Sequence, residues 1–123
     1  MDVRLSDAEL EVMEVLWSAG AALSATDVAG RVPAERRWSL ATVKSLISRL
    51  LAKQAIEPRP DGRRFLYSPA LDRDSYVGAE SRRFVSRLHG GKLSPLIAQM
   101  AGEEALDDED VAEIEALLRR LKS

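Results

Sequence analysis

Residues 24–67 restrict the fold of this chain more than any other stretch, because they predict two short helices followed by a basic β-hairpin. The second helix, predicted from Ser39 to about Gln54, has an apolar stripe at helical spacing. The members of this stripe are Leu40, Val43, Leu46, Ile47, Leu50 and Leu51. The hairpin has predicted strands at 55–59 and 63–67, joined by the turn Pro60-Asp61-Gly62. Helix, helix and cationic hairpin, in this order, predict a winged helix-turn-helix.

A further helix precedes this unit and completes its expected core. Ser6-Asp7-Ala8-Glu9 has the spacing of a capping box, in which Glu9 reaches back to the Ser6 amide. Gly20 is a suitable stop for the helix. The side chains expected to face the core are those of Leu10, Met13, Leu16 and Trp17. Residues 1–71 are therefore expected to form a winged-helix DNA-binding domain, so that the whole chain is mainly α-helical with one small β-hairpin.

The remaining residues, 72–123, predict three short helices, each with a single apolar stripe. Such helices gain most of their stability by packing these stripes together, and the stripes look too sparse to close a core alone. We therefore expect a helical dimerization region and a homodimer; the alternative is a monomer in which the helices fold back onto residues 1–71. The predicted dimerization residues are Phe84, Leu88, Leu96, Ile97, Val111, Ile114, Leu117, Leu118 and Leu121.

The net charge of −2 hides an uneven distribution along the chain. Residues 1–30 carry a net charge of −5, residues 31–68 one of +6, and residues 69–123 one of −3. Because a phosphate backbone responds to the charge of the contacting face, the basic middle segment favours nucleic-acid binding. The alternative is that the basic patch is only a solvated surface.

Small, hydroxylated or cationic side chains lie opposite the apolar stripe of the 39–54 helix, where they suit base edges and phosphates. Arg49 is expected to reach a phosphate, whereas Lys44 has two open alternatives, guanine or phosphate. Phe65 or Tyr67, or both, are expected to pack beneath the hairpin. The predicted DNA-binding residues are Thr42, Lys44, Ser45 and Arg49 on the helix, Arg59, Arg63 and Arg64 on the hairpin, and Arg36 and Arg37 before the helix.

Several classes of protein and site are disfavoured. The chain has no cysteine, so disulfides and thiolate metal sites are excluded. No apolar run approaches the ~20 residues of a membrane span. We expect no cofactor and no metal, and a soluble, cytoplasmic protein. An enzyme is also disfavoured, since the single histidine, His89, stands beside Gly90-Gly91 at a predicted helix end and no phosphate loop or nucleophile elbow is present.

In its order of motifs, the chain resembles the BlaI/MecI/CopY family of bacterial repressors. The matching segments run from Leu5 to Met13 and through Leu16-Trp17, Thr42-Val43, 46–50 and Lys53. They continue with the hairpin, its ending Tyr67-Ser68-Pro69, and the Phe84…Leu88-His89-Gly90-Gly91 region. Each motif is weak alone, but together they cover almost the whole length. The resemblance implies a winged-helix transcriptional repressor that binds a palindromic operator as a homodimer through its C-terminal helices.

The resemblance also bears on how the protein leaves DNA. In the antibiotic-responsive branch, a membrane sensor-protease is linked to cleavage at an Asn-Phe bond in the C-terminal helices. The aligned candidate position here is Gln99-Met100, which departs from that pattern at both residues. The copper branch carries a cysteine cluster, which this chain lacks. The release signal thus stays unidentified, and two other functions stay open: a winged-helix module for protein interaction, and a regulator with a small molecule bound between its C-terminal helices.

Overall fold

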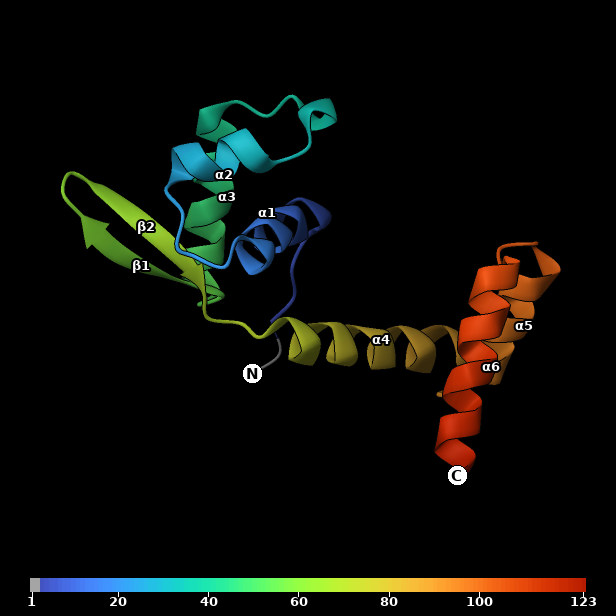
Figure 1. Ribbon diagram of the computed structural model, residues 1–123. Coiled ribbons are helices and arrows are strands. Elements are labelled where there is room, and N and C mark those ends of the chain that lie inside the picture. Colours follow the sequence, from blue (N-terminus) through green and yellow to red (C-terminus); the bar gives the residue numbers. More distant parts are fainter. Residues whose placement is uncertain (1–2) are drawn as a thin grey trace. The chain divides into compact units, whose positions relative to one another are not determined.

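The computed structural model describes residues 3–123 and divides the chain into two compact units, the first ending at Val77 and the second comprising Gly78–Ser123. In the first unit, three helices surround one core and a two-stranded hairpin extends from it (Figure 1). Its elements are α1 (Asp7–Ala19), α2 (Ala25–Arg31), the 3₁₀ turn η1 (Ala34–Arg36), α3 (Leu40–Ala52), β1 (Ile56–Asp61) and β2 (Arg64–Pro69). The helix α4 (Arg73–His89) begins in the first unit and continues into the second, which also holds α5 (Ser94–Gly102) and α6 (Asp108–Lys122).

A serine begins each of the three helices of the first unit. The capping box predicted at α1 is confirmed: the Ser6 amide donates to Glu9 Oε1 over 2.7 Å, and the Glu9 amide donates to Ser6 Oγ over 3.1 Å. Ser24 caps α2 in the same reciprocal way with Asp27. Ser39 Oγ accepts from the amide of Thr42 at the start of α3. These side chains satisfy amides that have no partner within the helix.

The core of the first unit is aliphatic and draws on all three helices. Its buried members are Val12, Met13 and Leu16 of α1, Val28 of α2, Val43, Leu46, Ile47 and Leu50 of α3, and Leu23, Ala55 and Ile56 from neighbouring segments. The predicted stripe of α3 is confirmed except at one margin, where Leu40 is 40% exposed and Leu51 is half-buried. Both lie about 70–90° around the helix from the centre of the four buried residues, and Leu40 is also the first residue of the helix. On α1, Leu10 and Trp17 are only half-buried, while Val12 is fully buried.

The turn of the hairpin differs from the prediction. Asp61 pairs with Arg64, so the loop is Gly62-Arg63, and Pro60 and Asp61 belong to β1. Gly62 has a left-handed φ of 64°, as two-residue loops often require at their first position.

Proline is tolerated in β1 because of how β2 is paired. On its other side, Tyr67 exchanges two backbone hydrogen bonds with Leu23, of 2.7 and 3.0 Å. The Tyr67 amide and carbonyl thus point away from β1, which makes Pro58–Tyr67 and Pro60–Phe65 the pairs without mutual hydrogen bonds. The N–H groups that proline lacks would point to the outer edge of β1, away from β2. No hydrogen bond between the two strands is therefore lost, and the missing donors discourage another strand from pairing at this edge.

The first turn of α4 packs within the first unit. Tyr76 is buried, its hydroxyl accepts from the Leu5 amide over 3.2 Å, and its ring lies 6.3 Å from that of Trp17. Trp17 Nε1 in turn donates to the Leu71 carbonyl over 2.8 Å. The compact unit therefore runs past Leu71, and the division of roles between residues 1–71 and 72–123 stays a prediction.

The three helices predicted in residues 72–123 are present, and the predicted helix end at His89 is confirmed. Helix α4 ends at His89, before Gly90 and Gly91 with φ of 60° and 82°, and Asp107 caps α6 by accepting from the Asp110 amide over 2.7 Å. None of residues 78–123, all of which the structure describes, is buried. Across residues 3–123, no helix has the length and apolar character needed to cross a membrane.

Candidate nucleic-acid interface

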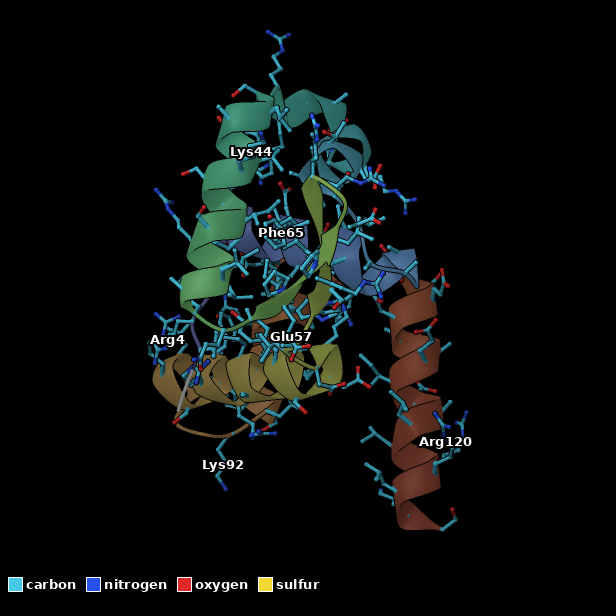
Figure 2. All side chains as sticks on the ribbon, turned by 90° about the vertical axis from the view of Figure 1, so that its left-hand side faces the viewer. Arg4, Lys44, Glu57, Phe65, Lys92 and Arg120 are labelled. Atoms are coloured by element: carbon cyan, nitrogen blue, oxygen red, sulfur yellow. The ribbon has the colours of Figure 1, made fainter. Side chains whose placement is uncertain are left out.

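Helix α3 has two faces of opposite character. The side chains of Val43, Leu46, Ile47 and Leu50 are buried. The other face is exposed along its whole length and consists of Ala41, Thr42, Lys44, Ser45, Ser48, Arg49 and Ala52. Figure 2 labels Lys44 on this helix and Phe65 on the neighbouring hairpin. The helix therefore presents small, hydroxylated and cationic groups to solvent, as its sequence predicts.

The four residues predicted to contact DNA from α3 are exposed but differ in their local bonding. The hydroxyl oxygens of Thr42 and Ser39 lie 3.1 Å apart in a hydrogen bond, so Thr42 is held near the helix start. Among residues 3–123, no side-chain hydrogen bond or ion pair involves Lys44, Ser45 or Arg49. These three polar groups are therefore available to a ligand.

The hairpin presents three exposed arginines, of which one has an intramolecular partner. Arg64 Nε lies 3.1 Å from Asp61 Oδ2 in an ion pair that spans the end of the strands. Within the described part of the chain, Arg59 and Arg63 form no such pair. Arg63 lies in the loop, not in a strand as expected, because the loop ends one residue later than predicted. The free positive charge of the hairpin is thus concentrated on Arg59 and Arg63.

Of the two arginines before α3, Arg36 is committed to the fold. Arg36 Nε lies 2.5 Å from Glu11 Oε2 of α1, and the guanidinium stands 5.4 Å from the centroid of the Trp38 ring. The hydrogen bond to Glu11 raises the pKa of Arg36 above its ordinary value. Arg37 is exposed, and its φ of 52° places it in the left-handed region. Sequence reasoning missed the Glu11 pair, since no local pattern links these two segments.

A buried carboxylate, also missed from the sequence, ties α3 to α1. Glu9 is 2% exposed, and Lys53 Nζ lies 2.6 Å from its Oε1 and 2.7 Å from the Arg4 carbonyl. Burial alone would raise the pKa of Glu9, but hydrogen bonds from Lys53 and Ser6 outweigh it and lower the pKa. Lys53 immediately follows α3, so the pair fixes one end of this helix against the beginning of α1.

The predicted dimerization residues all lie on the helices of the second unit, and none is buried. Phe84, Leu88, Val111, Leu117, Leu118 and Leu121 are exposed, and Leu96, Ile97 and Ile114 are half-buried. Single exposed leucines are ordinary on protein surfaces, but repeated exposure along α4 and α6 marks an incomplete core.

The candidate cleavage position lies inside a helix. Gln99 and Met100 belong to α5, and Gln99 Nε2 donates to Glu103 Oε2 one turn later over 2.8 Å. Met100 is half-buried. A protease would have to unwind this turn before it could bind the peptide bond in an extended form.

No group of three or more histidine, cysteine, aspartate or glutamate side chains in residues 3–123 is arranged to hold a metal ion. The ring of His89 lies 6.1 Å from that of Phe84 at the end of α4.

Comparison with known proteins agrees with this geometry. The family model for the penicillinase repressor matches residues 5–120. The penicillinase repressor of Bacillus licheniformis is 29% identical over 120 residues, which cover 98% of this chain and 93% of that protein. A solution structure of the DNA-binding domain of the repressor BlaI is 34% identical, with a TM-score of 0.53 over 59% of this chain and 88% of that one. The monomeric form of Bacillus licheniformis BlaI in complex with the blaP half-operator is also 34% identical, with a TM-score of 0.51 over 60% and 89% of the two chains.

Proposed function

The chain belongs to the penicillinase repressor family, and from this premise we propose that it is a DNA-binding transcriptional repressor that acts on a palindromic operator. The observation that carries the proposal is the exposed polar face of α3 beside a basic hairpin, in a segment of net charge +6. The related BlaI has been solved on its half-operator with a similar fold. This family is one of transcriptional repressors and not of enzymes, and we propose that the chain acts in the cytoplasm without a cofactor.

In the proposed complex, α3 enters the major groove with its exposed face toward the bases. Ser45 and Thr42 are short enough to let the helix backbone approach base edges, and Lys44 lies beside them. Arg49, one turn further along, binds a backbone phosphate. Arg59 and Arg63 of the hairpin bind phosphate or reach the adjacent minor groove, with Arg64 partly neutralised by Asp61. Arg37 adds attraction near the start of α3, whereas Arg36 supports the loop from which it extends.

Two copies of the chain are proposed to bind one operator. A two-fold symmetric dimer matches a palindromic site, in which each half-site is read by one α3. The support for dimerization is that α4 and α6 expose large apolar side chains, those of Phe84 and Leu88 on α4 and of Val111, Leu117, Leu118 and Leu121 on α6. Pairing of these helices with those of a second copy would remove that surface from water.

We propose that cleavage at Gln99-Met100 while α5 is folded is not what releases the protein from DNA, and that another signal does so. Neither residue matches the family's Asn-Phe pair, and both lie within α5. A sensor protease remains a candidate partner if it first unwinds this helix.

Mapping of genomic fragments bound by the purified protein tests this function. The wild-type chain should enrich a palindromic sequence, and Leu117→Glu combined with Leu118→Glu should give monomers that enrich it weakly. Ala112→Glu is the matched control, since it adds a charge to α6 about 155° around the helix from the apolar stripe. If the wild-type protein enriches no sequence, the repressor function is wrong; if the double variant still sediments as a dimer, the proposed dimer surface is wrong.

A further inference from the structure

Part of the hairpin surface outside the core is apolar, and the role proposed for the basic residues does not explain it. Side chains alternate between the two faces of a strand, so Ile56, Pro58 and Pro60 share one face of β1. Their partners on the same face of β2 are Pro69, Tyr67 and Phe65. Ile56 is buried and Tyr67 packs against the core, which identifies this as the core-side face. Toward the loop, the same face leaves the core and becomes exposed at Pro58, Pro60 and Phe65.

Phe65 is the main apolar group of this outer surface. Phe65 is 50% exposed, whereas the tyrosine two residues later is half-buried against the core. The expectation that one or both aromatic residues pack beneath the hairpin is met by Tyr67 alone. Phe65 is nearer the loop, where the strands extend beyond the core. Figure 2 shows Phe65 on the hairpin, between the loop and the strand ends that join the core. An aromatic ring of this size gains free energy when a partner covers it.

The backbone around Phe65 is stiff enough to hold the ring in place. Phe65 faces Pro60 in a pair without mutual hydrogen bonds, the kind in which opposing side chains lie closest. Proline fixes its own φ, so Pro58 and Pro60 restrict the strand on which the ring rests. Little conformational freedom would be lost on binding, which favours contact with a rigid partner.

The charge beside this surface favours one kind of partner. Arg63 lies in the loop two residues before Phe65, whereas Arg59 pairs with Leu66 and lies on the opposite face of the hairpin. Both arginines are exposed and have no ion-pair partner in residues 3–123. An apolar surface of three side chains is far smaller than the roughly 20 residues per side of a stable protein interface. A DNA backbone fits better, since its phosphates pair with arginine while the carbon-bound hydrogens of its deoxyribose rings accept an apolar contact.

We propose that Phe65, supported by Pro60, packs on deoxyribose of the operator backbone and supplies a salt-independent part of the DNA affinity. This inference rests on the proposed function, in which the hairpin lies against the duplex. Arginine contacts release counterions and weaken as salt rises, whereas an apolar contact releases none. The hairpin thus combines two contributions that respond differently to salt.

Measurement of operator affinity over a series of salt concentrations separates these contributions. Phe65→Ala should weaken binding about three- to tenfold at every salt concentration without changing the slope of log affinity against log salt. Arg63→Ala should instead flatten that slope by about one. Leu66→Ala is the matched control, because Leu66 is the next residue on the same strand and points to the opposite face. Equal affinity of Phe65→Ala and wild type would overturn the proposal.

A second measurement follows DNA binding by the wild-type protein and uses a variant only to assign a resonance. The chain has two phenylalanines, so wild-type protein labelled with fluorophenylalanine gives two ¹⁹F resonances, and loss of one in Phe65→Leu assigns Phe65. Addition of operator duplex should shift the Phe65 resonance at high and low salt. An unshifted resonance in a protein that binds DNA overturns this inference alone, whereas a wild-type protein that binds no duplex overturns the proposed function. A change in sedimentation of Phe65→Ala with unchanged DNA affinity would assign the ring to a protein contact, and also overturns the inference.

Discussion

Glu9 and Lys53 are 44 positions apart in the sequence, yet their side chains form an ion pair of 2.6 Å that joins the start of α1 to the end of α3. The same Glu9 carboxylate accepts from the Ser6 amide, so one buried group both caps α1 and locates α3. The pair therefore positions the C-terminal end of α3, the helix whose exposed face is predicted to bind DNA.

Lys53→Met should destabilise the protein, because it leaves the Glu9 carboxylate buried without its cation. Removal of one partner of a buried polar pair costs about 1–3 kcal/mol in free energy of unfolding. Urea denaturation measures this cost. Lys44→Met is the matched control on the same helix, since Lys44 is exposed and forms no ion pair within residues 3–123. Equal stability of the two variants would show that the pair contributes nothing.

The stability that Glu9 provides should disappear in acid. Its pKa in the folded protein lies below the ordinary value of 4.5, so the unfolded chain binds more protons as the pH falls. The contribution of Glu9 to the free energy of unfolding is complete above pH 4.5 and is lost as the pH falls through the pKa of Glu9 in the folded protein. Glu9→Gln keeps an N3 side chain suited to the capping box but cannot titrate. The difference in free energy of unfolding between wild type and Glu9→Gln should shrink with acid; a constant difference would contradict the assignment.

Arg49→Ala and Arg36→Ala should differ in what they change. Arg49 is free on the exposed face of α3, so its loss should weaken operator and random DNA alike and reduce the salt slope by about one. Arg36 is bound to Glu11 and Trp38, so its loss should lower stability and leave the slope unchanged. Filter binding or fluorescence anisotropy over several salt concentrations gives both slopes. The reverse pattern would exchange the roles of the two arginines.

The local parts of this structure could be predicted from the sequence because their causes are local. The Ser6-Glu9 capping box, the buried stripe of α3 and the glycine stop after His89 each depend on residues within a few positions of one another. The polar face of α3 follows directly, since the residues that do not point to the core must point to solvent.

The parts that the sequence did not predict depend on contacts between distant segments. Leu23 pairs with Tyr67, and this pairing determines which residues of β1 donate no backbone N–H to β2. Pro58 and Pro60 are at such positions and can therefore lie in a strand. Pro60-Asp61-Gly62 is a good turn pattern by itself, so the predicted loop began two residues too early. The ion pairs Glu11–Arg36 and Glu9–Lys53 also join residues far apart in the sequence. Because the sequence does not reveal the partner of Arg36, both Arg36 and Arg37 were predicted to contact DNA.

Selection of bound duplexes from a random pool, with wild-type protein and with Ser45→Ala, tests most directly whether the exposed face of α3 reads DNA. The wild-type protein should recover a palindrome whose half-sites are centred about 10–10.5 base pairs, or a multiple of this, apart. Ser45→Ala should change the preferred base at the same position of both half-sites and leave the spacing unchanged. Recovery of the same sequence by both proteins would remove Ser45 from base recognition, and recovery of no preferred sequence by the wild type would contradict the account as a whole.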